Sequence, residues 1–311
     1  MATWLWPARV EAAPNPLTPL SKKQRAILAA IPEDPPPKAL SADDHHFLVS
    51  DEHHAERFVP HLPQGGVYVG VGPEQSYLYA SWTRPVFLLL IDFDQMVVDL
   101  HGIYAAFFFE ADGGAGIITR WGKPAIGRAA IEAQVVDRTR RKELLSLYER
   151  ARKVVHPRLQ RLRKRHEAAK VKSFLTDEAH FNYVRALIVT GRSRALRGDL
   201  TGKRAMAGIA KAAGALGVPV RCLYLSNVEF YFDYDSGLGH NCAIQPTDAR
   251  SRVLRTVVRT EGKGRYHYCV QRTEHFRAWL ETGIERVGQM MARAFGRIRS
   301  DRGVLIIPGP R

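Results

Sequence analysis

Two apolar runs with polar ends constrain the fold of this chain more than any other part of its sequence. The first lies within Gly65–Ser76, which reads Gly-Gly-Val-Tyr-Val-Gly-Val-Gly-Pro-Glu-Gln-Ser, and the second is Phe87–Asp92. A strand, a glycine turn, a helix and a strand that ends in an acid form the order of a nucleotide-binding α/β crossover. Glycine lets the backbone approach a ligand, and the acid can accept hydrogen bonds from ribose hydroxyls. We therefore expect a nucleotide-type site at Gly70, Gly72 and Asp92.

The same residues also fit a purely structural interpretation. Tight turns from strand to helix need glycine in many folds, so Gly-x-Gly alone is weak evidence for a ligand. Asp94 competes with Asp92 for the role of the ligand-binding acid. Either carboxylate can instead cap the helix that follows.

Strand-like and helix-like segments alternate along the chain. The expected strands are residues 67–71, 86–91, 193–197, 220–225, 253–259 and 266–270, with a short apolar segment at 304–307. The expected helices are residues 41–62, 73–82, 96–110, 176–190, 202–216 and 273–299. This alternation predicts an α/β fold with a doubly wound, mostly parallel, Rossmann-like sheet that helices cover on both faces.

The domain organisation follows from changes in composition. Residues 1–40 are rich in proline and predict an extended arm with one short helix near residues 21–30. Residues 41–311 are expected to form a single α/β domain. Within it, residues 125–172 form a helical, basic insertion between the second and third strands, broken near His156-Pro157.

Bulk properties place the protein in solution. No apolar run approaches the roughly 20 residues that span a bilayer, so no membrane partner is expected. The first residues lack a basic segment followed by a long apolar one, which argues against export. The three cysteines are widely spaced and suggest a reducing compartment. A cytoplasmic location is therefore expected.

The net charge of +15 is concentrated in one segment. Residues Arg138–Lys172 carry fourteen Lys and Arg against three Glu, a local excess of 14 − 3 = +11. These three acids are too few to pair with the cations along a helix. The surplus favours contact with a polyanion such as a nucleic-acid backbone, and adaptation to a basic, Arg-rich proteome is the alternative.

Polar residues follow four of the expected strands. They are Gly70–Gln75, Asp92, Gly198-Asp199 and Ser226-Asn227. In a parallel sheet, ligands bind beyond the carboxyl ends of the strands, where the strand order reverses. We expect these clusters to meet there.

A family resemblance rests on these clusters and on the segments around them. The segments are Leu48–Glu52, Gly65–Gln75, Arg84-Pro85, Ile91-Asp92, Leu100–Tyr104 with Phe109-Glu110, Gly198-Asp199 and Tyr224–Glu229. In this order they resemble the core of class I methyltransferases that bind S-adenosylmethionine. More closely, they resemble a family of uncharacterised bacterial proteins built on that core. The resemblance covers roughly residues 45–110 and 174–257, but neither the arm nor the basic segment.

The resemblance implies roles for individual residues. The loop residues Gly70, Gly72, Glu74 and Gln75 would hold the methionine and ribose part of the cofactor, and Asp92 the ribose hydroxyls. Asp199, after Gly198, would face the adenine. Ser226 and Asn227 would lie near the transferred methyl group. By their own chemistry, Asn227 could hydrogen-bond an acceptor amide or hydroxyl, and Glu229 could act as a base. The loop departs from the usual pattern, because Gln75 stands where a third glycine is often found, and this incomplete pattern also disfavours NAD.

Other polar residues carry weaker signals. His101 lies among apolar residues of an expected helix and is more typical of packing than of a cleft. The pairs His45-His46 and His53-His54 do not have the spacing of a metal site, and no metal is expected.

Three functions remain open at this point. The favoured one is an S-adenosylmethionine-binding protein that methylates an acceptor the sequence does not identify. The first alternative is a non-enzymatic protein that binds nucleic acid through Arg138–Lys172. The second is a catalytically inactive relative of the methyltransferases that binds a metabolite or a partner protein.

Overall fold

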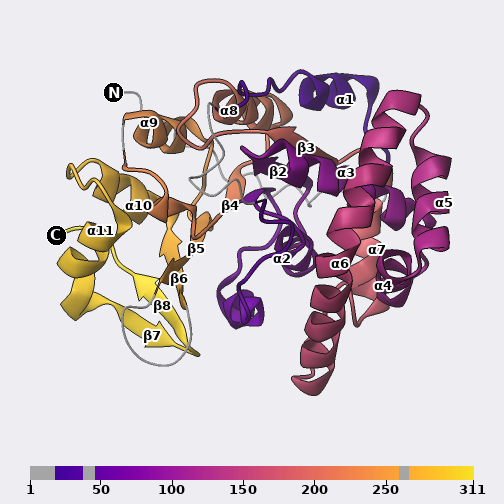
Figure 1. Cartoon of the computed structure of the whole chain (residues 1–311). Helices are drawn as coiled ribbons and strands as arrows, with labels where there is room; N and C mark the ends of the chain where they lie inside the picture. The colour runs from indigo at the N-terminus through magenta and orange to yellow at the C-terminus, as the bar shows by residue number, and fades with distance from the viewer. Residues whose placement is uncertain (1–17, 38–45, 235, 259–265) are drawn as a thin grey trace.

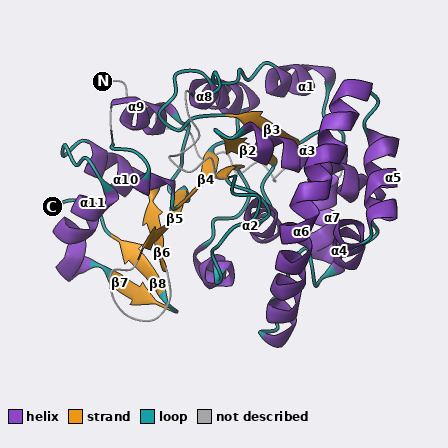
Figure 2. Ribbon diagram, in the orientation of Figure 1, coloured by secondary structure: helices purple, strands orange, loops and turns teal. Residues whose placement is uncertain are grey.

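The computed structural model describes residues 18–37, 46–234, 236–258 and 266–311. Within these residues one eight-stranded sheet runs in the order β3-β2-β1-β4-β5-β6-β8-β7 (Figure 1, Figure 2). The strands are β1 Val67–Val71, β2 Phe87–Asp92, β3 Ser193–Arg197, β4 Val220–Ser226, β5 Arg252–Val258, β6 Tyr266–Arg272, β7 Arg299–Asp301 and β8 Val304–Ile307.

Strands β1 to β5 are all parallel to one another, and β8 is parallel to β6, so the sheet is mostly parallel, as predicted. Strand β6 is antiparallel to β5, and β7 is antiparallel to β8. The order of the whole sheet is not the classic one for doubly wound sheets, because β6 is antiparallel and β8 and β7 extend the sheet beyond it. The chain nevertheless moves outward from β1 to β2 and β3, and then returns to place β4 on the other side of β1. The strand order therefore reverses between β1 and β4.

Helices cover both faces of the sheet. They are α1 Lys22–Ala29, α2 Gln75–Thr83, α3 Gln95–Glu110, α4 Gly114–Gly122, α5 Pro124–Gln134, α6 Arg138–Ala168, α7 Glu178–Val189, α8 Ala205–Leu216, α9 Ser236–Ile244, α10 Thr273–Leu280 and α11 Val287–Ala294, with 3₁₀ turns η1 Ala55–His61, η2 Val228–Phe230 and η3 Phe295–Arg297. None of the helices in the described residues is long and apolar enough to cross a membrane.

The helices are divided between two apolar cores, one on each face of the sheet. Helices α2 to α7 share one core with alternate strand residues such as Tyr68, Leu88 and Tyr224. Helices α1, α8, α9, α10 and α11 share the other with the intervening residues, such as Val69 and Leu223. Successive side chains of a strand point to opposite faces, which explains this division. The helical insertion, α5 and α6, lies together with α4 to one side of the sheet in Figure 1.

The described part of the N-terminal segment packs against the domain. Ser21 caps α1, accepting a hydrogen bond from the backbone N–H of Gln24 while the Gln24 side chain accepts one from the Ser21 N–H. Leu20, Leu28 and Ile31 are buried in the core that contains α8. The expected helix near residues 21–30 is therefore confirmed.

Two predicted helices were wrong. Residues 46–54 are not helical, and only η1 follows; residues 41–45 lie outside the described part. In this segment the Ser50 N–H donates to the Glu74 carboxylate, at 3.1 Å from N to Oε2, and not to a backbone carbonyl of a helix. The expected helix at 273–299 is split into α10 and α11 at a turn that contains Gly283, whose φ is 71°.

The predicted break near His156-Pro157 was also wrong, because α6 continues through Pro157. A proline inside a helix costs about 3 kcal/mol, since it removes a hydrogen bond and crowds the preceding turn. Val155, Arg158 and Leu159, directly beside it, are buried. Packing of these turns against the domain outweighs the local cost.

Candidate functional site

The glycine turn after β1 contacts the acid at the end of β2. The backbone N–H of Gly72 donates to Asp92, with 3.1 Å between N and Oδ2. The N–H of Asp94 donates to the other oxygen at 3.0 Å. Strands β1 and β2 are paired, so their carboxyl ends bring the turn and the acid together, as expected. A carboxylate has about four acceptor positions, so these two bonds leave Asp92 able to accept more.

Asp92 is half-buried and ionises with difficulty. Burial raises its pKa from 3.8 to about 7, and the nearby Asp94 carboxylate adds to this effect, while the backbone N–H bonds oppose it. Asp94 itself caps α3 through a bond from the Met96 N–H, at 2.9 Å. The capping role considered for Asp94 is thereby confirmed.

The two glycines of the turn face different surroundings. Gly72 has a φ of 76°, and a Cβ added there would meet nothing within 4 Å. A Cβ added to Gly70 would instead fall on the Tyr68 phenol ring. Gly72 therefore borders open space, whereas the nearest space at Gly70 is filled by Tyr68.

Gly198 and Asp199 follow β3 at the same edge. The Gly198 N–H donates to the backbone carbonyl of Asp92, at 2.9 Å. The Asp199 side chain is exposed and accepts hydrogen bonds from the N–H and hydroxyl of Thr201, which closes a local turn. The Asp34 carboxylate accepts the Asp199 N–H at 3.0 Å. Gly198 thus meets Asp92, while the Asp199 side chain is engaged in its own loop.

A second acid at this edge, Glu52, is fully buried. The hydroxyls of Tyr224, Ser226 and Thr256 donate to its Oε1, at 2.8, 2.7 and 2.8 Å. The Gln75 amide donates to its Oε2 at 2.6 Å. Burial raises the pKa of Glu52, and the three hydroxyl bonds oppose that shift. We call Glu52, Gln75, Tyr224, Ser226 and Thr256 the Glu52 cluster.

Ser226 has an unusual backbone. It ends β4 with a φ of 51°, in the left-handed region that residues other than glycine rarely occupy. Such conformations cost roughly 1–3 kcal/mol and persist where the surroundings impose them. The bond from its hydroxyl to Glu52 is one such constraint. The residue predicted to lie beside the transferred methyl group therefore has a strained backbone at the edge where the strand order reverses.

The insertion contributes a residue to this region. Arg158 of α6 forms a buried ion pair with Glu74, at 2.8 Å from Nε to Oε1. Its Nη2 also donates to the backbone carbonyl of Glu52, at 2.6 Å. The side chains of Glu74 and Gln75, predicted to contact a cofactor, are thus both occupied by protein partners.

Asn227 and Glu229 lie in different places. Asn227 donates to the Tyr266 hydroxyl at 3.2 Å, and that hydroxyl donates to Asp51 at 2.7 Å. Glu229 is buried, accepts a hydrogen bond from Tyr234 and pairs with Arg255 at 3.2 Å between Nε and Oε2. Arg255 and Thr256 are successive residues of β5, so Glu229 is on the opposite face of the sheet from Glu52. Glu229 therefore does not join the other residues of the site.

The structure also shows the contacts of the histidines that the sequence singled out. His101 is buried, and its Nδ1 is 2.9 Å from the Tyr77 hydroxyl, so the packing interpretation is confirmed. Burial lowers its pKa to about 4, and the Gly72 backbone opposes this shift. His46 contacts the Asp94 carboxylate at 2.7 Å, and His54 contacts Glu56 at 3.1 Å.

Sequence reasoning gave no role to Glu52 or Arg158. Glu52 stands in the run Asp51-Glu52-His53-His54, which is typical of an exposed segment, and no local pattern reveals its burial. Arg158 did carry a signal, because it lies on the same helical stripe as Ala151, Val155 and Leu162. A lone arginine on an apolar stripe needs a buried partner.

The side of α6 that faces away from its buried residues is strongly basic. Six of its Lys and Arg side chains are exposed, and no ion pair joins them to another described residue: Arg138, Lys142, Arg150, Lys153, Arg161 and Lys164. At about 100° per residue, all six fall within an arc of roughly 140°, opposite the buried stripe. We call these residues the α6 basic face.

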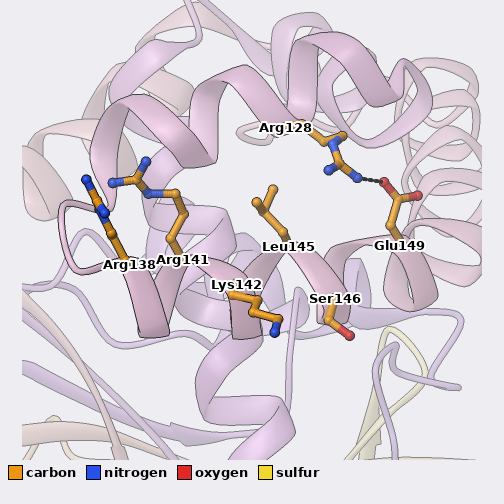
Figure 3. A pocket seen from close by; sticks show the side chains of 7 residues that line it. All are labelled: Arg128, Arg138, Arg141, Lys142, Leu145, Ser146 and Glu149. Atoms are coloured by element: carbon orange, nitrogen blue, oxygen red, sulfur yellow. Dashed lines mark hydrogen bonds and ion pairs between the residues drawn. The ribbon is translucent and has the colours of Figure 1, made fainter.

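A cavity of about 440 Å³ lies at one end of this face, between α5 and α6. Figure 3 shows the cations of Arg138, Arg141 and Lys142 along one side and the Arg128–Glu149 ion pair on the other. The distance between Arg128 Nη1 and Glu149 Oε1 is 2.9 Å. Cations therefore outnumber acids around the cavity by four to one.

Comparison with known proteins gives one family. The family model described as "Domain of unknown function (DUF7790)" matches residues 47–305. This range includes strands β1 to β7, the Glu52 cluster and α6, and it ends within β8. No curated protein matches the sequence.

Proposed function

The chain belongs to the DUF7790 family, a domain of unknown function, and we propose that it binds S-adenosylmethionine at the carboxyl edge of the sheet and methylates an acceptor. The proposal includes a Rossmann-like, methyltransferase-like assignment of the strands β3-β2-β1-β4-β5. A ligand at this edge would lie where the strand order reverses.

One observation carries the proposal: the 3.1 Å hydrogen bond from the Gly72 N–H to Asp92. It joins a turn that borders open space to a half-buried carboxylate with spare acceptor capacity. A nucleoside needs both features, a backbone that it can approach and an acid for its ribose hydroxyls. The fit is better for Gly72 and Asp92 than for Gly70, because Tyr68 occupies the space beside Gly70.

When bound, S-adenosylmethionine supplies a methyl group on a positively charged sulfur. In this proposal Asp92 holds the ribose, and Gly72 keeps the loop close to it. The Glu52 cluster positions Ser226, and with it the start of the loop that carries Asn227. Catalysis would rest mainly on proximity and alignment of the acceptor, because the sulfur loses its charge in the reaction. Glu229 is omitted as a base because it is paired with Arg255 on the other face.

Calorimetric titration with S-adenosylmethionine and its demethylated product tests the binding step. We expect saturable binding that Asp92→Ala reduces by more than tenfold, through loss of the carboxyl group that accepts hydrogen bonds from the ribose. Asp99→Ala is the matched control, since Asp99 is an acid of α3 that pairs with Arg140 instead. Equal losses in both variants, or no binding in the wild type, would contradict the proposal.

A second candidate function rests on the α6 basic face. Its six cations extend over residues 138–164, about 40 Å of helix, and face away from the core. Phosphates bound there would displace counterions, so affinity would fall steeply with salt. We propose nucleic-acid contact along this face, whether or not the chain is an enzyme.

A salt series with random duplex and single-stranded DNA tests the contact. Four charge reversals at Lys142, Lys153, Arg161 and Lys164 should lower the slope of log affinity against log salt by about 3 to 4 for duplex. Reversals at the exposed Lys22, Lys23, Lys211 and Arg293 change the net charge equally and serve as the control. If both variants lose affinity to the same extent, the effect belongs to net charge and not to α6.

A further inference from the structure

A large groove lies at the opposite edge of the sheet. It has a volume of about 1110 Å³ and includes Arg252, the first residue of β5, and Arg272, the last of β6. Because β5 is parallel to β4, this is the edge where β4 and β5 begin, whereas Ser226 ends β4 at the other edge. The groove is therefore separate from the site described above.

The walls of the groove are basic. Five arginines line it, Arg250, Arg252, Arg272, Arg297 and Arg299, together with His61 and His275. No Asp or Glu is among its lining residues, although Asp248 pairs with Arg250, Glu274 with Arg272 and Asp301 with His61. Arg252 and Arg297 donate only to backbone carbonyls within the described residues. Positive charge in excess of its partners thus surrounds the groove.

Two of these arginines are directly opposite each other. Arg252 and Arg272 are partners in the antiparallel pairing of β5 and β6. Like charges at such positions repel and destabilise the pair. Burial lowers the pKa of Arg252, and the neighbouring Arg272 lowers it further, while the Glu274 and Asp248 carboxylates offset part of this shift. A bound anion would relieve this repulsion.

Apart from Gln64, Gln271 and Gly296, the rest of the lining is apolar. It includes Leu62, Val270, Ile306 and the prolines at 60, 63 and 308. Ligand pockets typically combine such a lining with a few polar groups, in volumes of roughly 300–1,000 Å³. The arginine fork matches phosphate oxygens in geometry as well as in charge. We propose that this groove binds a phosphate ester with an apolar or planar body, of the size of a nucleotide.

Isothermal titration with ATP tests the proposal, with tripolyphosphate and adenosine as probes of the charge and the body alone. We expect one ATP site, with weaker binding of both fragments. Arg252→Gln and Arg299→Gln should each weaken ATP binding about tenfold. If Arg252→Gln fails to fold, Arg299→Gln still tests the groove, because Arg299 is exposed and its replacement should not disturb folding.

Two further variants test whether ATP binding is specific to the groove. Lys211→Gln, in α8, removes an exposed cation elsewhere and should leave ATP affinity unchanged. Asp92→Ala distinguishes the groove from the proposed nucleoside site at the other edge of the sheet, because a loss of ATP affinity in this variant would place ATP there instead. The proposal is overturned if ATP binding is absent, if it is as sensitive to Lys211→Gln or Asp92→Ala as to the groove variants, or if tripolyphosphate binds as tightly as ATP.

Discussion

Arg158 and Glu74 form a buried ion pair that joins the basic insertion to the candidate site. The Arg158 Nε is 2.8 Å from Glu74 Oε1, and Glu74 is the N-cap residue of α2, directly after the glycine turn. The helix that carries the basic face on one side therefore supports the glycine turn with its other side. The two candidate functions share one structural element.

Loss of this ion pair should be costly. Arg158→Ala leaves the Glu74 charge buried without its partner, and such a change typically costs about 3–5 kcal/mol. Arg163→Ala breaks the exposed pair with Glu167 on the same helix and should cost less than about 1 kcal/mol. Urea unfolding of both variants measures the difference. Similar costs would show that Arg158 does not anchor α6.

The left-handed backbone of Ser226 predicts an unusual order among its variants. Ser226→Ala loses the hydroxyl bond to the Glu52 carboxylate, which is worth about 1.5–3 kcal/mol. Ser226→Gly loses the same bond but relieves a conformation that costs roughly 1–2 kcal/mol for residues with a Cβ. We expect the glycine variant to be the more stable of the two by about 1 kcal/mol in urea unfolding. The reverse order would mean that the Ser226 backbone is not strained.

Asp92 should make stability depend on pH. Its folded pKa of about 7 is above the ordinary value of 3.8, so the folded protein holds a proton that the unfolded chain releases between these values. Stability from this group therefore falls as pH rises from about 4 to about 7, and is constant above that. Because Asp92 is partly exposed, the change should be on the order of 2 kcal/mol.

Asp92→Asn isolates that contribution. The difference in unfolding free energy between wild type and variant, measured at pH 4.5, 6 and 7.5, should shift against the wild type as pH rises. Glu52 also has a raised pKa, but it is present in both proteins and cancels in the difference. A constant difference would mean that Asp92 ionises normally.

Replacing glycine by alanine should have opposite effects on stability at Gly70, in the glycine turn, and at Gly214, on a helix with open space beside it. Gly70→Ala forces a Cβ onto the Tyr68 ring in a packed core, and overpacking of this kind costs about 1–3 kcal/mol. Gly214→Ala in α8 meets nothing within 4 Å, and should stabilise the protein by up to about 1 kcal/mol through helix propensity. Thermal unfolding distinguishes the two directions. Equal tolerance at both positions would show that Tyr68 can move aside.

Local pattern was sufficient for every strand except β7, which the sequence did not predict, and for several helix ends. The runs at 67–71 and 193–197 have the observed bounds, the run at 86–91 is displaced by one residue from Phe87–Asp92, and the run at 220–225 is one residue shorter than Val220–Ser226. Asp94 caps α3, and the helix expected to end at residue 216 does end there, with Gly217 in the left-handed region as its C-cap. In each case the deciding interactions lie within a few residues along the chain, where the sequence displays them directly.

Contacts between distant residues decided the remainder. Glu52 is buried because hydroxyls from β4 and β5, more than 170 residues away in sequence, surround it. The helix through Pro157 persists because Arg158 reaches Glu74. Glu229 and Ser226, three residues apart, are on opposite faces of the sheet. The charge of a side chain is written in the sequence, but its partner and its exposure to water depend on which strands the fold makes neighbours.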